Sequence, residues 1–429
     1  MRVFKFGGAS VKNADAVRNV ARILERFKEE ELVVVISAMG KTTNALEEVM
    51  QANAMNDTKL ALEKINGIAS FHQEIISELF AQESEKALLL VQPFFEQLRT
   101  RLTTPFSGRY HFEYDQLISF GELLSTTIIN AFLQLEGLKS TWADARELIR
   151  TDDRWREGRV QWEVTQVLIQ ATLEKNRKAG HRITVTQGFI GHDSQGHTTT
   201  LGREGSDFTA SIFAYCLNAN DVTIWKDVPG MLNADPKYFD NTVLLEKISF
   251  KEAIELAYFG ASVIHPKTIQ PLKRKKIPLH IKSFINPDAE GSVIQESLMY
   301  DDQIPSFIFK LNQVLVSLTP KDFSFIIEEN LAHIFDFLNR EKIRINLMQN
   351  SAVSFSFMVD ASKVNLDKLV NYFQDDYLIK YNRHLELVTI RHYDEPTIKR
   401  VTLGKKIILE QKSRQTARLV IQDEKQNNT

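Results

Sequence analysis

Through the first two thirds of the chain, short apolar segments alternate with longer stretches whose apolar residues recur with helical spacing. This alternation predicts an α/β domain with a mostly parallel sheet, because parallel neighbours are joined by long crossovers that are usually helices. We expect strands at residues 3–6, 32–37, 183–187, 222–225 and 278–283. We expect helices at residues 14–29, 113–135, 206–217 and 250–258, and a helical insertion from about 57 to 102.

After about residue 292 the pattern changes to that of a smaller module. Strand-like, helix-like, strand-like, strand-like, helix-like and strand-like segments follow one another at residues 308–318, 331–340, 343–348, 354–360, 366–373 and 385–390. This βαββαβ order is that of a ferredoxin-like module, whose size suits a ligand-sensing or dimerising unit. Two further strands are expected at 401–409 and 416–421, with no helix between them. We therefore divide the chain into residues 1–295, 304–392 and a partial second unit at 393–425.

Charge and cysteine content narrow the possible partners. The 53 Lys and Arg residues nearly balance the 55 Asp and Glu residues, so nothing draws the whole molecule to nucleic acid or an anionic membrane, and a small molecule is the expected partner. The single cysteine, Cys216, excludes an internal disulfide and a multi-cysteine metal site and fits a reducing cytosol. We expect a cytoplasmic protein with no signal peptide and no membrane span, and we assign no metal ligands.

Two loops that follow expected strands contain the first residues that could bind a ligand or take part in catalysis. Lys5 lies near the end of the opening strand, and Gly7 and Gly8 follow that strand just before a helix. Glycine amides can approach phosphate oxygens closely, and Lys5, whose side chain we expect to reach solvent, can neutralise a transferring phosphoryl group. Ser37 and Thr43 lie in the polar turn after the next strand, at the sheet edge where such folds bind ligands. Tight turns and helix caps use the same residues, so each signal alone also has a purely structural interpretation.

Two later segments add charged groups to the same kind of position. Residues 198–207 pass through a glycine- and serine-rich turn into a helix, and they include Arg203 and Asp207. Arg203 can hold a carboxylate in a two-pronged contact, and Asp207 can orient a lysine that handles phosphates. Residues 224–230 and 233–237 form a strand end and two turns that could hold the base and ribose of a nucleotide. A helix cap with a solvated ion pair, and ordinary turn chemistry, are the alternatives.

These segments in this order resemble the aspartate kinases over nearly the whole chain. Two more segments carry the resemblance, Ser-Phe-Gly-Glu-Leu-Leu-Ser at 119–125 and Phe-Gly-Ala-Ser-Val-Ile-His-Pro at 259–266. The resemblance implies the amino acid kinase fold, a mostly parallel sheet between helical layers, with aspartate and ATP meeting across the strand ends. It also implies that ACT modules make up the tail.

The resemblance further implies roles for individual residues. Lys5, Arg203 and Asp207 match catalytic positions, with Arg203 holding the substrate carboxylate and Asp207 organising the active-site lysines. Glu122 is expected to meet the amino group of the substrate. The implied aspartate-binding residues are Ser37, Thr43, Glu122, Arg203 and Ser206, and the implied ATP-binding residues are Lys5, Gly7, Gly8, Lys226, Asp227, Leu232, Lys237 and Ser262.

Several positions depart from the commonest family pattern. Ala9 occupies a position where the family usually has Thr, and Glu204 one where it often has Gly. Leu232 replaces an aromatic residue. Lys226 replaces a Thr or Ser, and Ser262 occupies a place where many members carry a second phosphate-binding lysine. Losing a cation from a phosphoryl-transfer site is costly, because catalysis there is mainly positioning and charge stabilisation. We hypothesise that Lys226 restores the charge missing at Ser262.

The implied reaction is attack of the aspartate β-carboxylate on the γ-phosphate of ATP, giving 4-phospho-L-aspartate and ADP. A carboxylate is already ionised at neutral pH, so no general base is needed. Mg²⁺ is expected from the reaction class. A kinase for glutamate, acetylglutamate or UMP is one alternative, against which the tail and the segments at 119–125 and 202–207 argue. A catalytically weakened amino-acid sensor is the other, motivated by Ser262 and the altered nucleotide edge.

The tail suggests how activity is regulated. In lysine-inhibited relatives, acidic side chains of the ACT module meet the amino groups of the effector, whereas Asn346 and Ala352 fall at those places here. The loop at 328–330 also lacks the glycine that usually lets a ligand approach the backbone. We expect a homodimer joined through the ACT region, with weak or absent inhibition by lysine, and leave a threonine response open.

Overall fold

The computed structural model describes residues 1–261, 264–322 and 324–423. The chain divides into two compact units. The first unit comprises Met1–Met231, Leu244–Ile254 and Ser262–Tyr300, and the tail unit comprises Leu232–Val243, Glu255–Ala261 and Asp301–Thr429. In this division two short segments of the first 295 residues group with the tail, and the expected ranges 1–295, 304–392 and 393–425 stay a prediction.

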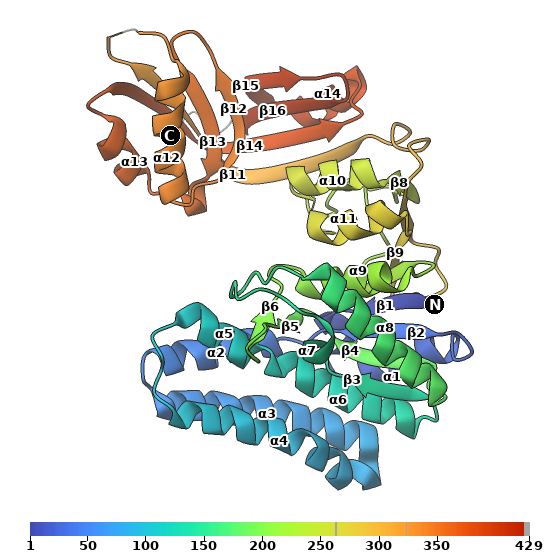
Figure 1. Ribbon diagram of the computed structural model, residues 1–429. Helices are drawn as coiled ribbons and strands as arrows, with labels where there is room; N and C mark the ends of the chain where they lie inside the picture. Colours follow the sequence, from blue (N-terminus) through green and yellow to red (C-terminus); the bar gives the residue numbers. More distant parts are fainter. Residues whose placement is uncertain (262–263, 323, 424–429) are drawn as a thin grey trace. The chain divides into compact units, whose positions relative to one another are not determined.

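The first unit is built on an eight-stranded sheet with the strand order β3-β4-β2-β1-β7-β9-β10-β8 (Figure 1). Its strands are β1 (Arg2–Phe6), β2 (Leu32–Ile36), β3 (Ser140–Ala143), β4 (Ile183–Gln187), β7 (Val222–Lys226), β8 (Lys247–Ser249), β9 (Leu279–Ser283) and β10 (Ser292–Gln295). All neighbouring pairs run parallel except β9 and β10. The five expected strands are present, and the predicted mostly parallel sheet is confirmed.

Helices cover both faces of this sheet, as apolar strands buried on both sides require. Phe4 and Phe6 belong to the core shared with α1 (Ala14–Glu25) and α6 (Phe120–Leu135). Since side chains alternate along a strand, Val3 and Lys5 project to the other face, where α9 (Gly205–Leu217) packs on β1, β2 and β7. Other helices of this unit are α2 (Thr42–Ala54), α5 (Tyr110–Ile118), α7 (Ala145–Leu148), α8 (Trp162–Lys178), α10 (Phe250–Phe259, which continues into the tail unit) and α11 (Pro266–Lys275).

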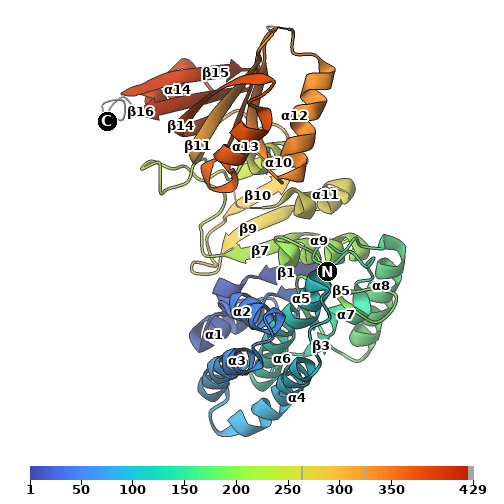
Figure 2. The same cartoon turned by 90° about the vertical axis from the view of Figure 1, so that its left-hand side faces the viewer.

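The expected helical insertion is present as α3 (Thr58–Phe80) and α4 (Ser84–Thr103), which lie side by side (Figures 1 and 2). The helix expected at 113–135 is two helices, α5 and α6, which meet at Ser119. The Ser119 hydroxyl donates to the Gln116 carbonyl, a back-bond that bends helices. The run Tyr110–Leu135 is apolar and long enough to cross a membrane, but 89% of its apolar window is buried inside the protein, as in a core helix.

The tail unit contains a six-stranded antiparallel sheet with the order β12-β13-β11-β14-β16-β15. The elements β11 (Ser306–Pro320), α12 (Glu328–Arg340), β12 (Ile345–Asn350), β13 (Phe355–Asp360), α13 (Leu366–Phe373) and β14 (Tyr377–Arg391) follow in the predicted βαββαβ order. The strand expected at 401–409 begins only at 405, because residues 401–402 end a helix, α14 (Glu395–Thr402), that begins with an Asp394 cap and Pro396, and a turn follows at 403–404. The strands β15 (Lys405–Lys412) and β16 (Thr416–Asp423) then extend the same sheet beside β14.

Candidate active site

The candidate site lies in the first unit, at the carboxyl ends of neighbouring strands. Phe6, the last residue of β1, pairs with Ile36 at the end of β2 and with Trp225 near the end of β7. Ile36 pairs in turn with Gln187, the last residue of β4. The loops that follow these strands therefore leave the sheet from one common edge, where open α/β sheets bind ligands.

Lys5, Asp207 and Lys226 form a compact charged cluster at this edge. The Lys5 Nζ lies 2.6 Å from Oδ1 of Asp207, and the Lys226 Nζ lies 3.5 Å from Oδ2. Burial by itself would raise the pKa of Asp207, but attraction to Lys5 and Lys226 and hydrogen bonding to them hold it below its ordinary value. Asp207 therefore stays ionised and draws two ammonium groups to one point. Lys5 itself is only 8% exposed, so the expectation that it reaches solvent was wrong.

The glycine pair after β1 brings two loops together. A side chain at Gly8 would lie 2.9 Å from the Ala38 carbonyl oxygen and 3.0 Å from that of Gly40. The Gly40 amide donates to the Gly8 carbonyl at 3.1 Å. Gly8 thus permits a close approach between the loop after β1 and the loop after β2, which contains Ser37 and leads into α2, whose second residue is Thr43. Its phosphate-binding role stays a prediction.

Glu122 is a buried carboxyl group that points toward the same loops. It lies in the first turn of α6, is 3% exposed, and accepts a hydrogen bond from the Ala38 amide through Oε1 at 3.4 Å. Among the residues that the structure describes, its buried Oε2 has no hydrogen-bond partner. Burial raises the pKa of Glu122 to about 8, although the Ala38 amide and the charge of Lys5 oppose the rise. A buried acceptor left unsatisfied is unfavourable until a donor arrives, so this group fits a ligand ammonium.

Arg203 lies in the turn before α9 and is exposed, while Ser206 and Asp207 are buried in the first turn of that helix. Glu204 caps the helix in a left-handed conformation with φ 54°. Glycine adopts this conformation most easily, so a glutamate here strains the backbone. Packing favours glycine at position 188, because a side chain there would overlap Ser206. The turn that presents Arg203 is therefore tightly constrained.

Asp115 is a positioning residue that the sequence analysis did not single out. Fully buried in α5, it accepts hydrogen bonds through Oδ2 from the amides of Thr200 and Arg156, both at 2.9 Å, and through Oδ1 from the Thr200 hydroxyl at 2.7 Å. Burial raises the pKa of Asp115 to about 6 despite these bonds. The Gln116 side chain donates to the carbonyl oxygen of Thr198 and accepts from its amide, in the hairpin that β5 (Ile190–His192) forms with the following strand. Together they fasten the strand β6 (Thr198–Thr200), which leads to Arg203.

The remaining predicted nucleotide residues are not all placed in this cluster. Asp227 follows Lys226 at the edge and is exposed. Leu232 and Lys237 belong to the tail unit, and Ser262 lies outside the described residues. Their contact with a nucleotide stays a prediction.

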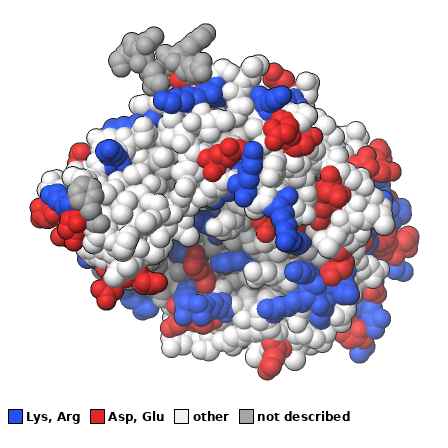
Figure 3. All heavy atoms as spheres, turned by 90° about the horizontal axis from the view of Figure 1, so that it is seen from above, with Lys and Arg blue, Asp and Glu red and all other residues white. Residues whose placement is uncertain are grey.

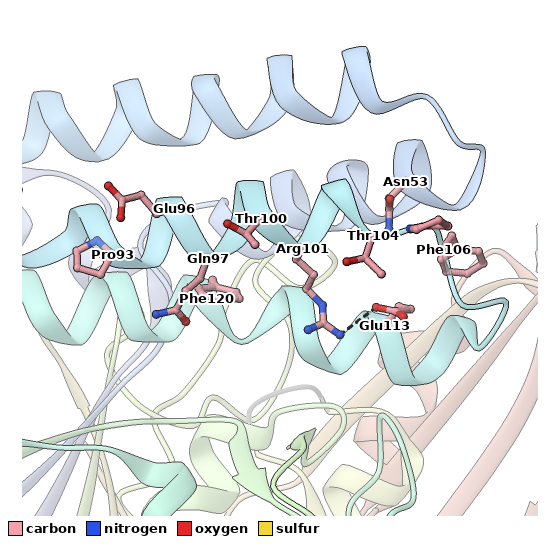
Figure 4. Close-up of a pocket in the computed structure, with 11 residues that line it drawn as sticks. Asn53, Pro93, Glu96, Gln97, Thr100, Arg101, Thr104, Phe106, Glu113 and Phe120 are labelled. Atoms are coloured by element: carbon pink, nitrogen blue, oxygen red, sulfur yellow. Dashed lines mark hydrogen bonds and ion pairs between the residues drawn. The ribbon is translucent and has the colours of Figure 1, made fainter.

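A cavity of about 610 Å³ lies elsewhere, among the helices of the insertion (Figure 4). Arg101 of α4 points into this region and pairs with Glu113 of α5 at 3.1 Å. Its lining includes Asn53 of α2 and Phe120 of α6 but none of the predicted site residues. Among the described residues, no group of three or more His, Cys, Asp or Glu side chains could hold a metal ion.

Comparisons with known proteins identify the family. A sequence model of the amino acid kinase family matches residues 1–283. The chloroplastic aspartokinase 1 of Arabidopsis thaliana is 33% identical over 380 residues, covering 84% of this chain and 64% of that protein, just under two thirds of its length. The lysine-sensitive aspartokinase 3 of Escherichia coli is 31% identical, covering 84% of this chain and 78% of that protein.

A solved structure agrees over nearly the whole chain. The E. coli aspartokinase III in complex with aspartate and ADP superposes with a TM-score of 0.74 at 27% identity, covering 99% of this chain and 97% of that one. The chain belongs to the amino acid kinase family and, within it, to the aspartokinases. The amino acid kinase fold expected from the sequence is confirmed, and the tail sheet is consistent with the ACT region of these proteins.

Proposed function

We propose that this protein is an aspartate kinase, which transfers the γ-phosphoryl group of ATP to the β-carboxylate of L-aspartate and so begins the synthesis of lysine, threonine and methionine. The observation that carries the proposal is the pairing of two lysines with Asp207 beside the unsatisfied carboxyl group of Glu122, all at one edge of the sheet. The two lysines suit a phosphate chain, and the carboxyl group of Glu122 suits an amino group. The aspartate and ADP bound by the E. coli relative support the same pair of ligands.

In the proposed reaction a β-carboxylate oxygen attacks the γ-phosphorus, and the bond from that phosphorus to the β,γ-bridging oxygen breaks. The electron pair leaves with ADP, whose growing negative charge the ammonium groups of Lys5 and Lys226 stabilise. Asp207 fixes both lysines in place. Glu122 receives the substrate ammonium, and Arg203 grips its α-carboxylate in a two-pronged contact.

Mg²⁺ would enter with the nucleotide, because the described residues provide no carboxylate cluster to hold it alone. Bound to the phosphates, it supplies further charge neutralisation. We also infer a cytoplasmic location, which suits the buried unpaired Cys216, and no nucleic-acid or membrane partner. Basic and acidic side chains are interspersed over the face seen in Figure 3, which supports this inference.

The decisive assay measures ADP release with aspartate, with glutamate and without an amino acid. Release that depends on aspartate supports the proposal, and release with glutamate would favour another kinase of the family. Binding of aspartate without turnover would favour the weakened sensor, the second candidate, which the Ser at position 262 motivates.

We further infer a homodimer formed through the tail, with weak or absent inhibition by lysine. Asn346 already uses its side chain, accepting from the Lys310 Nζ at 2.8 Å and donating to Gln313 Oε1 at 2.7 Å. Arg418 donates to its carbonyl oxygen. Lys310, Arg344 and Arg418 surround this point with positive charge, which opposes a cationic effector.

A further inference from the structure

We propose that the tail unit contains a binding site for a compact oxyanion, a phosphate group or a carboxylate, formed by Lys310, Arg344 and Arg418. The site lies within the tail and shares no residue with the charged cluster around Asp207. The inference therefore goes beyond the proposed function, and it can be tested whether or not the protein phosphorylates aspartate.

Two of these cations project from the same face of the tail sheet. Lys310 on β11 pairs with Leu387 on β14, which pairs in turn with Val420 on β16. Directly paired residues of antiparallel strands lie on the same face, and so do residues two apart along one strand. Arg418 therefore lies on the same face as Val420 and Lys310, although its strand is separated from β11 by β14.

Both cations converge on one neutral residue. The Nζ of Lys310 donates to the Oδ1 of Asn346 at 2.8 Å, and the Nη2 of Arg418 donates to the Asn346 carbonyl oxygen. Neither acceptor carries a negative charge. Arg344 lies two residues before Asn346, is exposed, and makes no hydrogen bond or ion pair with any residue that the structure describes.

The charge around Lys310 is strongly positive. Burial, then Arg344 and Arg418, lower its pKa, so both guanidinium groups lie within electrostatic range of its ammonium group. Lys363 adds to this effect and Asp360 opposes it, so that in this group one acid faces four cations. A bound oxyanion would offset their mutual repulsion, and the attraction is strengthened because Lys310 is partly shielded from water.

Hydrogen-bond donors remain for such a ligand. The Nε of Arg418 is buried and has no partner in the described part of the chain, which is unfavourable until an acceptor arrives. An ammonium group has three N–H donors, and Lys310 uses one of them for Asn346. A guanidinium group offers paired donors that match two oxygens of a carboxylate or phosphate, so Arg344 and Arg418 favour an oxyanion over a halide.

The end of α10 limits the size of the ligand. The ring centroid of Phe259 lies 5.2 Å from the guanidinium carbon of Arg418. A side chain at Gly260 would lie 2.9 Å from the Cε of Lys310, so the main chain of this segment passes close to the lysine. Neither residue carries a side-chain acceptor. The space beside these two cations therefore suits a compact anion better than a nucleotide.

The test titrates inorganic phosphate and, separately, citrate into the full chain by calorimetry, at an ionic strength matched with sodium chloride. ADP is present throughout, so that an anion bound at the proposed nucleotide site is not counted. We expect at least one of the two anions to bind, and the tighter of the two identifies the group that the site prefers.

The variants assign this binding to the tail cluster. Arg344→Gln comes first, because Arg344 is exposed and unpaired among the described residues and so is not needed for folding. We expect the anion Kd to rise by about 10- to 100-fold, the usual contribution of a hydrogen bond to a charged group. Arg418→Gln should have a similar effect, and Arg418→Lys should retain part of the affinity. The matched control is Lys380→Gln, an exposed lysine of β14 that pairs with Ser317, toward the other end of β11.

Thermal unfolding gives a second measurement. Without an anion, Arg344→Gln should not lower Tm, because it removes a repulsive charge. The anion that binds should raise the Tm of the wild type and of Lys380→Gln more than that of Arg344→Gln, since a ligand of the folded state stabilises it.

Two results would overturn the proposal. One is the absence of binding by either anion, and the other is an anion affinity in Arg344→Gln within twofold of wild type, even if Arg418→Gln fails to fold. A wild-type protein that binds the anion through this cluster but shows no turnover with aspartate would disprove the proposed function and leave this inference intact.

Discussion

Two partly buried lysines show how differently the two units treat the same charge. Lys5 in the first unit lies against a carboxylate, Asp207, that remains ionised. Lys310 in the tail unit donates to the neutral amide of Asn346, and burial, then Arg344 and Arg418, lower its pKa. Asp360 opposes that shift but does not outweigh it. The first unit thus stabilises its cations, while the tail gathers cations that destabilise one another.

Under the proposed function, this difference would separate a cluster that attracts an anion from one that repels a cation. Lysines already held beside Asp207 can attract phosphates without reorganisation. The tail cluster is already hydrogen-bonded through Asn346 and is positively charged, so a lysine effector would lose one set of bonds and meet repulsion. The following predictions test whether this contrast governs activity and regulation.

The largest effect is expected for Lys5→Ala. Removing a preorganised charge-stabilising group should lower kcat by about 10²–10³-fold. Because Lys5 and Asp207 are both buried, stability should also fall, although Lys226 remains to compensate part of the carboxylate charge. Steady-state kinetics and thermal unfolding measure both effects. Lys28→Ala, which breaks an exposed lysine–glutamate pair, is the control and should change neither appreciably. Near-normal turnover in Lys5→Ala would remove Lys5 from the active site.

The sequence could single out the three charged residues of this cluster because they occupy local motifs. Lys5, Asp207 and Lys226 follow or precede recognisable strand ends and helix starts, and the structure brings all three together. Asp115 could not be predicted, because its partner Thr200 lies 85 residues away. The sequence signal for Asp115 was an acidic side chain within a largely apolar helical segment.

In the tail, short amphipathic elements were predicted more closely than long irregular ones. The helix α13 begins and ends where its apolar spacing indicated. The strand β14 begins at Tyr377 rather than near 385, because its first half is largely exposed and shows no alternation of apolar and polar residues. Its pairing with β11 also shifts register between Lys310 and Leu315, and such irregularities leave no simple sequence pattern.

The next effect concerns pH and Glu122. Its pKa is raised to about 8, so below this pH the carboxyl group is mostly protonated and must lose its proton to pair with the substrate ammonium. We expect kcat/KM for aspartate to rise by up to about tenfold per pH unit as pH increases toward 8, following the titration of one group. Glu122→Gln should lower kcat/KM and flatten this dependence. A wild-type profile that is flat between pH 6 and about 8 would show that Glu122 does not bind the amino group.

A smaller effect is expected for Arg203→Lys. Lysine keeps the charge but cannot reproduce the two-pronged contact with a carboxylate, so KM for aspartate should rise by about tenfold with little change in KM for ATP. Initial rates measured against each substrate separate the two constants. A change confined to ATP would assign Arg203 to the nucleotide.

The smallest effect is expected for lysine added to the wild-type protein. The cations Lys310, Arg344 and Arg418 surround Asn346, and no acid replaces it to supply the charge that makes an ammonium contact strong. We therefore expect kinase activity to change by less than about twofold when lysine is added up to about 1 mM. This concentration is the upper end of usual KM values. Threonine, titrated in parallel, tests an effector without the side-chain charge. Inhibition by micromolar lysine would show that repulsion in the tail does not decide the response, and that the contrast between the two lysine environments has no regulatory consequence.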